Sequence, residues 1–289
     1  MTKTQQFKAL LLSDQLEFLL EAHNGISAKI VQHAGFKGIW ASSLTLSASW
    51  CVRDSNELSW TQIVDMLELM NDAADIPILM DGDTGYGNFN TVRRLVKHLE
   101  RSGIAALCIE DKVFPKNNSF QNNTRHELVS VSEFCGKIRA AKDAQVDSYF
   151  SLIARTEGFI AGISLTEVLD RACAYEEAGA DAIVVHSKRS DCKEIDNFMS
   201  MWQGTVPIII IPTKYYTTEI NHFRQLGIQM VIWANQMLRG TVSHLEYLAH
   251  SIYSQESVVS IESTIASLSS IFTYQNVSEL EEAEKKYLG

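Results

Sequence analysis

Short apolar segments alternate with segments of helical period along most of this chain. The apolar segments are rich in Val, Ile and Leu and occupy residues 16–20, 38–41, 77–80, 106–109, 151–154, 182–185, 207–211 and 230–234. They are apolar throughout instead of alternating with polar residues, as strands of a parallel sheet buried on both faces are. The pattern therefore predicts eight parallel strands.

The segments between these strands carry apolar residues with the period of an α-helix. Trp60, Ile63, Val64 and Leu67 stand at positions i, i+3, i+4 and i+7, which places them on one face of a helix. Residues 165–172 repeat this spacing. We therefore expect helices that cover a parallel sheet.

The chain length suits one large domain made of these units. A chain of 289 residues lies inside the range of (β/α)8 barrels, which need about 250 residues. We predict an α/β fold, a (β/α)8 TIM-type barrel, as a single domain over residues 1–289. A doubly wound parallel sheet is the alternative that the pattern leaves open.

Residues 236–289 extend beyond the length that a barrel needs, and we expect them to form a C-terminal helical arm. The pattern predicts a helix over residues 236–254 and an acidic helix at the end of the chain. Between them, Ile261, Ile265, Leu268 and Phe272 form another apolar helical stripe. This stripe needs a partner, which is either the barrel itself or a second subunit.

Composition and charge exclude several classes of protein. The net charge of −10, without a run of Lys or Arg, argues against nucleic acids and anionic lipid as partners. No apolar stretch reaches the roughly 18 to 20 residues of a membrane span, and the first residues do not resemble a signal peptide. Five cysteines without a C-x-x-C pair are typical of the reducing cytoplasm, so we expect neither a disulfide framework nor a cysteine-based zinc site.

All eight predicted strands end in polar or ionisable residues. These residues are Glu21, His23, Ser42, Asp81, Asp83, Glu110, Asp111, Arg155, Glu157, His186, Thr213, Lys214 and Asn235. Solvation at a strand end would explain any one of them, but it is a poor explanation of the whole set. In a (β/α)8 barrel the active site lies at the C-terminal ends of the strands, so we expect these side chains to surround it.

Carboxylates dominate the ends of the third and fourth strands. Asp81 and Asp83 stand two residues apart after the third strand, so both point to one side, and Glu110 ends the next strand. Hard oxygen ligands without a Cys or His cluster suit Mg²⁺, with Mn²⁺ as the alternative, rather than zinc. An EF-hand does not fit, because its ligand spacing is missing.

Cationic groups end the fifth and sixth strands. Arg155 and His186 predict an anionic substrate that bridges them and the metal. A buried ion pair of Arg155 with Glu157 or Glu110 is the structural alternative, and both arrangements can coexist. The long polar segment 111–127 follows the fourth strand directly, where we expect a lid over the active site.

Several motifs together resemble the phosphoenolpyruvate mutases of the isocitrate lyase superfamily. In chain order they are EAHNGISAKIVQHAGFKGIWAS, VRDSNELSWTQ, DGDTGYGN, EDKVFPKNNS, ARTEGFIAG, GADAIVVHSK, IPTKYY and EKKYL. The resemblance implies a barrel whose last helix is swapped between subunits of a homodimer, often paired into a homotetramer. It also implies Mg²⁺-dependent interconversion of phosphoenolpyruvate and phosphonopyruvate by intramolecular phosphoryl transfer.

The resemblance also assigns roles to individual positions. Asp81 is the expected direct metal ligand, and Asp54, Asp83 and Glu110 are expected to hold the waters of the metal. The expected substrate contacts are Trp40, Ser42, the backbone of Ser43 and Leu44, Asn118, Arg155 and His186. Lys116 is expected to seal the lid, and it is counted with Asp54, Asn118, Arg155 and His186 as catalytic.

Some positions depart from the pattern of this family, and they bear on the alternatives. Ser43 stands where a Gly is common, and Gly82 and Gly158 stand where Ala is common. Phosphonopyruvate hydrolase is the nearest alternative, although it tends to carry Thr where Asn118 stands. A carbon–carbon lyase of the superfamily would carry a cysteine in the lid, and a non-catalytic metabolite-binding barrel would have lost metal carboxylates. This sequence shows neither feature.

Overall fold

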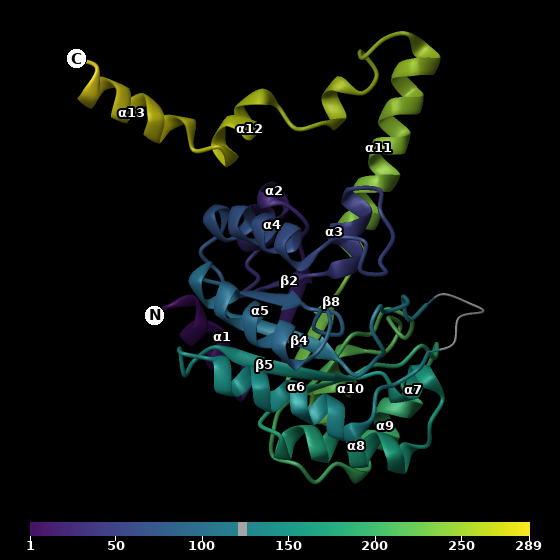
Figure 1. The fold of residues 1–289 in the computed structure, drawn as a ribbon. Helices are drawn as coiled ribbons and strands as arrows, with labels where there is room; N and C mark the ends of the chain where they lie inside the picture. Colours follow the sequence, from purple (N-terminus) through teal and green to yellow (C-terminus); the bar gives the residue numbers. More distant parts are fainter. Residues whose placement is uncertain (121–125) are drawn as a thin grey trace. The chain divides into compact units, whose positions relative to one another are not determined.

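Eight parallel strands close into one barrel in the computed structural model, which describes residues 1–120 and 126–289. Each strand pairs with its neighbours in sequence, and β1 pairs with β8 to complete the ring. Helices follow the strands around the outside (Figure 1). The predicted (β/α)8 barrel is therefore confirmed, and the doubly wound sheet is excluded.

The strands lie where the apolar segments predicted them, within two residues at either end. Their bounds are β1 Glu17–Glu21, β2 Ile39–Ala41, β3 Ile78–Asp81, β4 Ala106–Glu110, β5 Ser151–Thr156, β6 Ala182–Val185, β7 Ile208–Ile210 and β8 Met230–Trp233. The β4–β5 register places Glu110 beside Arg155, and the β3–β4 register places Asp81 beside Cys108. These registers determine how far along the barrel axis each polar strand end lies relative to its neighbours.

The longer helices between strands bury one face each, as the period of the segments 60–67 and 165–172 predicts. In the barrel their bounds are α2 Gly25–His33, α3 Ser43–Ser49, α4 Trp60–Ala73, α5 Phe89–Arg101, α6 Val131–Ala144, α7 Gly158–Ala161, α8 Leu165–Glu177, α9 Lys193–Met201 and α10 Ile220–Gln225. The predicted stripe of α4 is buried at Ile63, Val64 and Leu67. Packing of such a face against the strands is what stabilises short helices in a protein.

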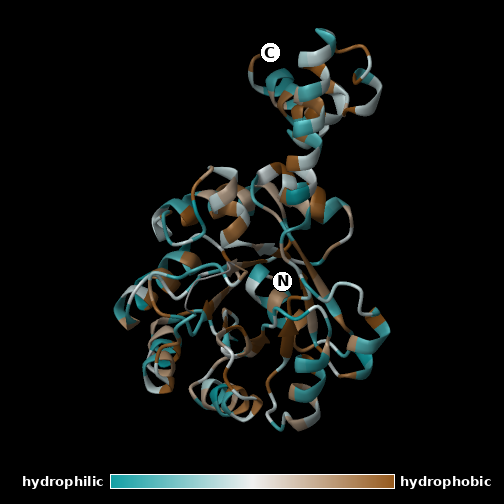
Figure 2. Cartoon of the chain, turned by 90° about the vertical axis from the view of Figure 1, so that its right-hand side faces the viewer, coloured by the Kyte–Doolittle hydropathy of each residue, from teal (hydrophilic) through white to brown (hydrophobic). Residues whose placement is uncertain are grey.

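A helix before the first strand, α1 (Lys3–Leu11), closes one end of the barrel and was not predicted. Phe7, Leu10 and Leu11 belong to the same buried cluster as residues of the barrel interior such as Leu19 and Ile209. In Figure 2 the N-terminus lies over the centre of the brown strands, with helices around it. The sequence does hold a start signal, because the side chains at positions 2 and 5 form a capping box.

The chain divides into two compact units, residues 1–237 and 238–289. The second holds most of α11 (Gln236–Gln255), then η1 (Glu262–Thr264), α12 (Leu268–Tyr274) and α13 (Val277–Tyr287). The helices predicted over residues 236–254 and at the end of the chain are confirmed. The prediction that one helix carries the stripe from Ile261 to Phe272 is wrong, because the backbone is extended at Ile265.

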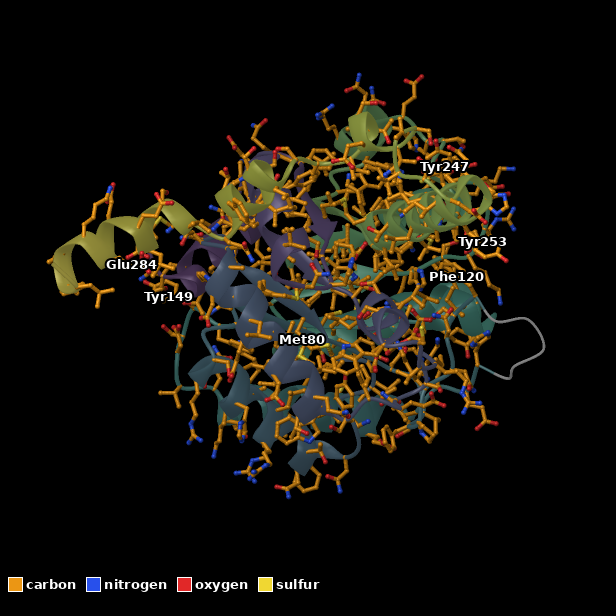
Figure 3. All side chains as sticks on the ribbon, turned by 90° about the horizontal axis from the view of Figure 1, so that it is seen from above. Met80, Phe120, Tyr149, Tyr247, Tyr253 and Glu284 are labelled. Atoms are coloured by element: carbon orange, nitrogen blue, oxygen red, sulfur yellow. The ribbon has the colours of Figure 1, made fainter. Side chains whose placement is uncertain are left out.

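Apolar side chains of the second unit are largely exposed. Tyr247 and Tyr253 of α11, labelled in Figure 3, are 53% and 85% exposed, and Phe272 of α12 is 49% exposed. Within residues 238–289, all of which the structure describes, the buried side chains are those of Ser251 and Ile261. Among the described residues, no helix combines the length and the apolar character needed to cross a membrane.

Candidate active site

One cavity at the C-terminal ends of the strands gathers most of the predicted site residues. Ten of the twelve line it: Trp40, Ser42, Ser43, Leu44, Asp54, Asp81, Lys116, Asn118, Arg155 and His186. The other two, Asp83 and Glu110, are buried and lie within ion-pair distance of Lys116 and Arg155 respectively. The fold therefore brings together all twelve residues from segments far apart in the sequence.

The turn after β3 positions two of the carboxylates. Asp81 ends the strand, and its Oδ2 accepts hydrogen bonds from the Ser43 hydroxyl at 3.0 Å and the Ser43 backbone N–H at 3.3 Å. Asp83 has a φ of 50°, and its carbonyl accepts a hydrogen bond from the Glu110 N–H at 2.7 Å. Gly85, with a φ of 85°, completes the turn in a region that favours glycine. This backbone holds the carboxylates of two neighbouring strands together.

Lys116 places a buried ammonium group among these carboxylates. Its Nζ lies 2.9 Å from Asp54 Oδ1 and 2.5 Å from Asp83 Oδ1, and it donates a hydrogen bond to Ser43 Oγ at 2.8 Å. Burial, joined by the charges of Asp81, Asp54 and Glu110 and opposed by Lys116, raises the pKa of the Asp83 carboxyl to about 7. Although burial lowers the pKa of Lys116, the surrounding carboxylates raise it well above its usual value. Lys116 therefore stays charged.

The carboxylate cluster has the donor set of a hard divalent cation. Asp54 Oδ1, Asp83 Oδ1 and Glu110 Oε1 are buried and make no hydrogen bond among the described residues, although Lys116 lies close to the first two. Lys116 supplies one positive charge to this cluster of carboxylates, which leaves negative charge for a further cation to balance. Because every donor is oxygen, the residues fit Mg²⁺ or Mn²⁺.

Arg155 and His186 are held by one buried carboxylate. Glu157 Oε1 lies 2.5 Å from Arg155 Nε and 2.7 Å from His186 Nδ1. Arg155 Nε also lies 3.4 Å from Glu110 Oε2, so the predicted ion pair with Glu157 or Glu110 is present. It coexists with a place for Arg155 in the cavity wall. Burial, followed by the charge of Arg155, lowers the pKa of His186, which keeps the imidazole neutral near pH 7.

Two nitrogen atoms in the cavity wall are left without a protein partner. Trp40 Nε1 and His186 Nε2 are buried and make no hydrogen bond with any residue that the structure describes. Both side chains line the cavity beside Arg155. Buried polar atoms are nearly always hydrogen-bonded, so these positions indicate a ligand that carries oxygen atoms.

The segment after β4 packs over the cavity as far as Phe120, whose ring meets that of His186 edge to face at 5.5 Å. Asn118 Nδ2 donates to Asp54 Oδ2 at 2.6 Å, and the Ser119 hydroxyl donates to Glu157 Oε2 at 2.5 Å. The described part of the predicted lid 111–127 thus contacts both the carboxylate and the arginine sides of the cavity. Its residues 121–125 lie outside the described residues.

Asn56 and Lys112 were missed by the sequence analysis. Asn56 Oδ1 accepts a hydrogen bond from the Lys116 N–H at 2.8 Å, and its Nδ2 donates to Asp83 Oδ2 at 2.7 Å. Lys112 Nζ lies 3.0 Å from Glu157 Oε2 and donates to Ser119 Oγ at 2.6 Å. Both residues tie the segment after β4 to the site. The position of Asn56, two residues after Asp54, was the only sequence signal for it.

Some of the other predicted strand-end residues line the cavity, and others do not. Thr213 and Asn235 line the cavity. Glu21 and His23 form a buried pair, 2.7 Å apart, and are not among the lining residues. Lys214 Nζ lies 5.5 Å from the centre of the Phe120 ring, where it makes a cation–π contact.

The departures from the family pattern fit their surroundings. A Cβ atom at Gly82 would lie 2.4 Å from Leu107 Cδ1 and 2.9 Å from the Cys108 carbonyl oxygen. The Ser43 side chain is turned toward Asp81 and Lys116, which both hydrogen-bond to it. The Ser43 hydroxyl thus joins the carboxylate cluster.

Comparisons with known proteins agree with this arrangement. The family model described as phosphoenolpyruvate phosphomutase matches residues 7–253. A phosphoenolpyruvate phosphomutase of Tetrahymena pyriformis is 51% identical over 99% of this chain and 95% of its own length. The crystal structure of a phosphoenolpyruvate phosphomutase from Streptomyces platensis subsp. rosaceus superposes with a TM-score of 0.97 at 40% identity, covering 99% of both chains. A phosphonopyruvate hydrolase in complex with oxalate and Mg²⁺ superposes with a TM-score of 0.94 at 36% identity, covering 100% of both chains.

Proposed function

The chain belongs to the phosphoenolpyruvate phosphomutase family, and from this premise we propose that it is a phosphoenolpyruvate mutase, an isomerase that interconverts phosphoenolpyruvate and phosphonopyruvate. The observation that carries the proposal is a single cavity lined by acidic side chains on one side and by cationic or polar side chains on the other. One wall presents buried carboxylates around Asp81, and the other presents Arg155 and His186. A substrate that is both a phosphoryl compound and a carboxylate fits between a metal and these cationic or polar groups.

Mg²⁺ is the proposed metal, and Mn²⁺ should replace it. Asp81 would bind the ion directly, and Asp54, Asp83 and Glu110 would hold its water molecules. The buried carboxylate oxygens support this assignment, as does the Mg²⁺ complex of the similar hydrolase. The ion supplies a Lewis acid that stabilises negative charge on the enolate oxygen of pyruvate.

The residues around Arg155 hold the migrating phosphoryl group. Ser42, Asn118 and Arg155 surround it with hydrogen-bond donors, His186 lines the same wall, and Glu157 keeps the arginine and imidazole oriented. The backbone N–H groups of Ser43 and Leu44, in the first turn of α3, would bind the substrate carboxylate, because such groups have no partner within the helix. In the structure the Ser43 N–H donates to Asp81 Oδ2 at 3.3 Å, so the substrate would replace this long hydrogen bond. The substrate is thereby fixed at both ends.

The reaction moves the phosphoryl group within one pyruvate skeleton. The bond from phosphorus to the enol oxygen breaks and its electron pair stays on that oxygen, which gives the pyruvate enolate. The C3 carbon of the enolate then attacks the same phosphorus, through a transition state with metaphosphate character. No proton is transferred, so the protein needs only to position the substrate and to exclude water. Water is the competing nucleophile. Asn118, Ser119 and Phe120 close the cavity for this purpose.

Product analysis tests the proposed function. Phosphorus NMR of the purified protein with phosphonopyruvate and Mg²⁺ should show conversion to phosphoenolpyruvate, with little pyruvate and free phosphate. Pyruvate and phosphate as the main products would contradict the mutase and support the alternative, a phosphonopyruvate hydrolase.

A homodimer or homotetramer formed by exchange of C-terminal helices is the proposed assembly. The exposed apolar side chains of residues 238–289 and the family resemblance support it. Light scattering should give at least twice the mass of the chain. Phe272→Glu on α12 should promote dissociation, because it places charge on an apolar surface, whereas Ser269→Glu on the same helix should not. A stable, active monomer at micromolar concentration would refute this assembly.

The cytoplasm is the proposed compartment. The proposed partner is a small anionic substrate, and we expect the protein to bind neither nucleic acid nor a membrane. The free thiols of all five cysteines are consistent with a reducing compartment. The net charge of −10 disfavours phosphate backbones and anionic lipid surfaces.

A further inference from the structure

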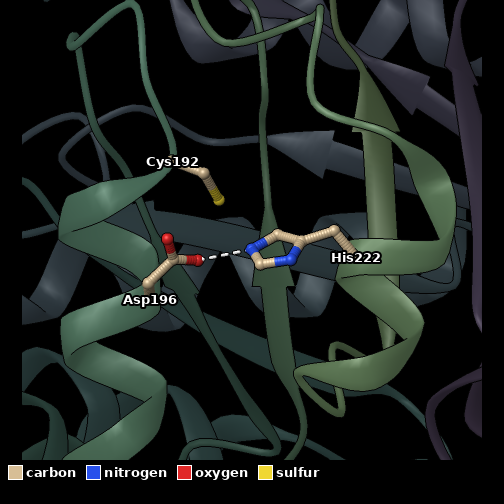
Figure 4. A group of neighbouring side chains, drawn as sticks. All are labelled: Cys192, Asp196 and His222. Carbon is tan, nitrogen blue, oxygen red and sulfur yellow. Dashed lines mark hydrogen bonds and ion pairs between the residues drawn. The ribbon is translucent and has the colours of Figure 1, made fainter.

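Cys192, Asp196 and His222 converge outside the active-site cavity. Cys192 is the N-cap residue of α9, Asp196 lies one turn further along this helix, and His222 belongs to α10. Figure 4 shows the three side chains pointing toward one another from these two helices. None of the three lines the active-site cavity, so the mechanism makes no use of them.

The distances within this cluster suit a metal ion. A sulfur, a carboxylate oxygen and an imidazole nitrogen all lie within 4.8 Å of one another. His222 Nε2 and Asp196 Oδ1 are 2.7 Å apart, so they already share a hydrogen bond. The Cys192 side chain is buried, whereas the side chains of Asp196 and His222 are 37% and 40% exposed. An ion can therefore enter from solvent and reach the thiol.

Tyr215 gives an independent indication of a missing ligand beside the cluster. Its side chain is fully buried, and its hydroxyl makes no hydrogen bond with any residue that the structure describes. Its ring packs edge to face against that of Phe223, the residue after His222, with the two ring centres 6.3 Å apart. A water molecule bound to an ion at the cluster would supply the missing partner.

Negative charge surrounds the cluster. Asp196 contributes a carboxylate to the cluster, and Asp191 precedes Cys192 in the sequence. Arg189, which is paired with Asp191, and Lys193 are the cations nearby in the sequence. A divalent cation would balance the carboxylate of Asp196 and stabilise the thiolate form.

We propose that Cys192, Asp196 and His222 bind Zn²⁺, with water as the fourth ligand. Zinc is the ion of choice because thiolate, imidazole and carboxylate are its usual protein ligands in four-coordinate sites. The set differs from the oxygen-only cluster around Asp81, so the two sites select different metals. The sequence analysis expected no cysteine-based zinc site, because the cysteines form no C-x-x-C pair, and it did not connect Cys192 with His222, 30 positions further along the chain.

This site would connect two neighbouring units of the barrel. Cys192 follows the segment that carries His186 after β6, and His222 lies on the helix that follows β7. The ion would join the start of α9 to α10 by bonds that are absent from the metal-free protein. Zinc should therefore raise the melting temperature of the protein, because it binds the folded form preferentially.

Cobalt spectroscopy tests the site directly. Chelator-treated full-length protein is first given excess Mg²⁺ to occupy the carboxylate cluster, and then one equivalent of Co²⁺. Wild type should show the near-ultraviolet charge-transfer band of a thiolate bound to Co²⁺, and added Zn²⁺ should remove the band by displacement. Equilibrium dialysis should show about one tightly bound Zn²⁺ per chain, and the melting temperature should rise by several degrees.

Matched variants assign the ligands. Cys192→Ser should abolish the band and weaken Zn²⁺ binding at least about 100-fold, and His222→Gln, at a half-exposed position, should weaken it similarly. Cys173→Ser, which removes an exposed cysteine of α8, should behave as wild type. The proposal is overturned if wild type shows no thiolate band, or if Cys192→Ser and His222→Gln retain zinc as wild type does. Because binding and melting are read without substrate, these outcomes are independent of the proposed enzymatic activity.

Discussion

Replacement of Asp81 by Ala should abolish turnover, and so should removal of the divalent cation by EDTA. Asp81 is the proposed direct ligand at the end of β3, where Ser43 orients its carboxylate. Without the ion, negative charge on the enolate oxygen has no counter-charge, which should cost about 4 kcal/mol or more, roughly 1,000-fold in rate. Added Mg²⁺ or Mn²⁺ should restore the EDTA-treated wild type but not Asp81→Ala.

Matched variants separate a metal ligand from a general effect of charge. Asp83→Ala should weaken metal binding by about 10- to 100-fold, less than Asp81→Ala does, because Asp83 is proposed to act through water. Asp65→Ala on the exposed face of α4 should change neither binding nor turnover. Calorimetric titration with Mg²⁺ and an assay with phosphonopyruvate give the two readouts. Full activity in EDTA would show that the metal assignment is wrong.

Asn118→Ala should slow the mutase reaction by about 30- to 1,000-fold, because one polar contact to the migrating group in a dry site contributes roughly 2 to 4 kcal/mol. In the structure Asn118 Nδ2 donates one hydrogen to Asp54 Oδ2, which leaves its second amide hydrogen for a phosphoryl oxygen. Asn118→Thr has a shorter side chain with one hydroxyl. It should leave room for water and divert part of the phosphonopyruvate to pyruvate and phosphate.

A variant outside this segment, at a residue that contacts it, shows whether diversion is specific to Asn118. Asn56→Ala removes the hydrogen bonds to the Lys116 N–H and to Asp83, but Asn56 does not line the cavity. It should lower the overall rate while leaving the ratio of phosphoenolpyruvate to free phosphate unchanged. Phosphorus NMR measures both quantities in one sample. If Asn56→Ala releases as much phosphate as Asn118→Thr, water exclusion depends on the whole segment rather than on the Asn118 side chain.

Local patterns were sufficient to predict most of the fold. The strands buried on both faces leave uninterrupted apolar runs, and a helix with one buried face leaves a stripe such as Ile63, Val64 and Leu67. Two predictions were incomplete or wrong for local reasons. The apolar patch of α1 is short, and the stripe around Ile265 has helical spacing but a backbone that is extended there. Spacing alone does not show where a helix ends.

The composition of the active site was predicted from strand ends and from the family resemblance. Of its internal contacts, only the ion pair of Arg155 with Glu157 or Glu110 was predicted. Parallel strands all end at one face of a barrel, so Asp81, Glu110 and Arg155 were expected to meet. That Glu157 holds both Arg155 and His186 depends on the height of β5 relative to β6, which the register sets. Asn56 lies in a loop whose path no periodic pattern describes.

The sequence by itself determined the order of strands and helices, the residue types at the strand ends and the family. These properties depend on short-range periodicity and on motifs that are contiguous in the chain. Only the tertiary structure decided that Lys116 lies among the carboxylates of Asp54 and Asp83, and that Cys192, Asp196 and His222 lie side by side. Such contacts join segments that are distant in the sequence, and they arise when closure of the barrel brings successive strand-to-helix connections together in space.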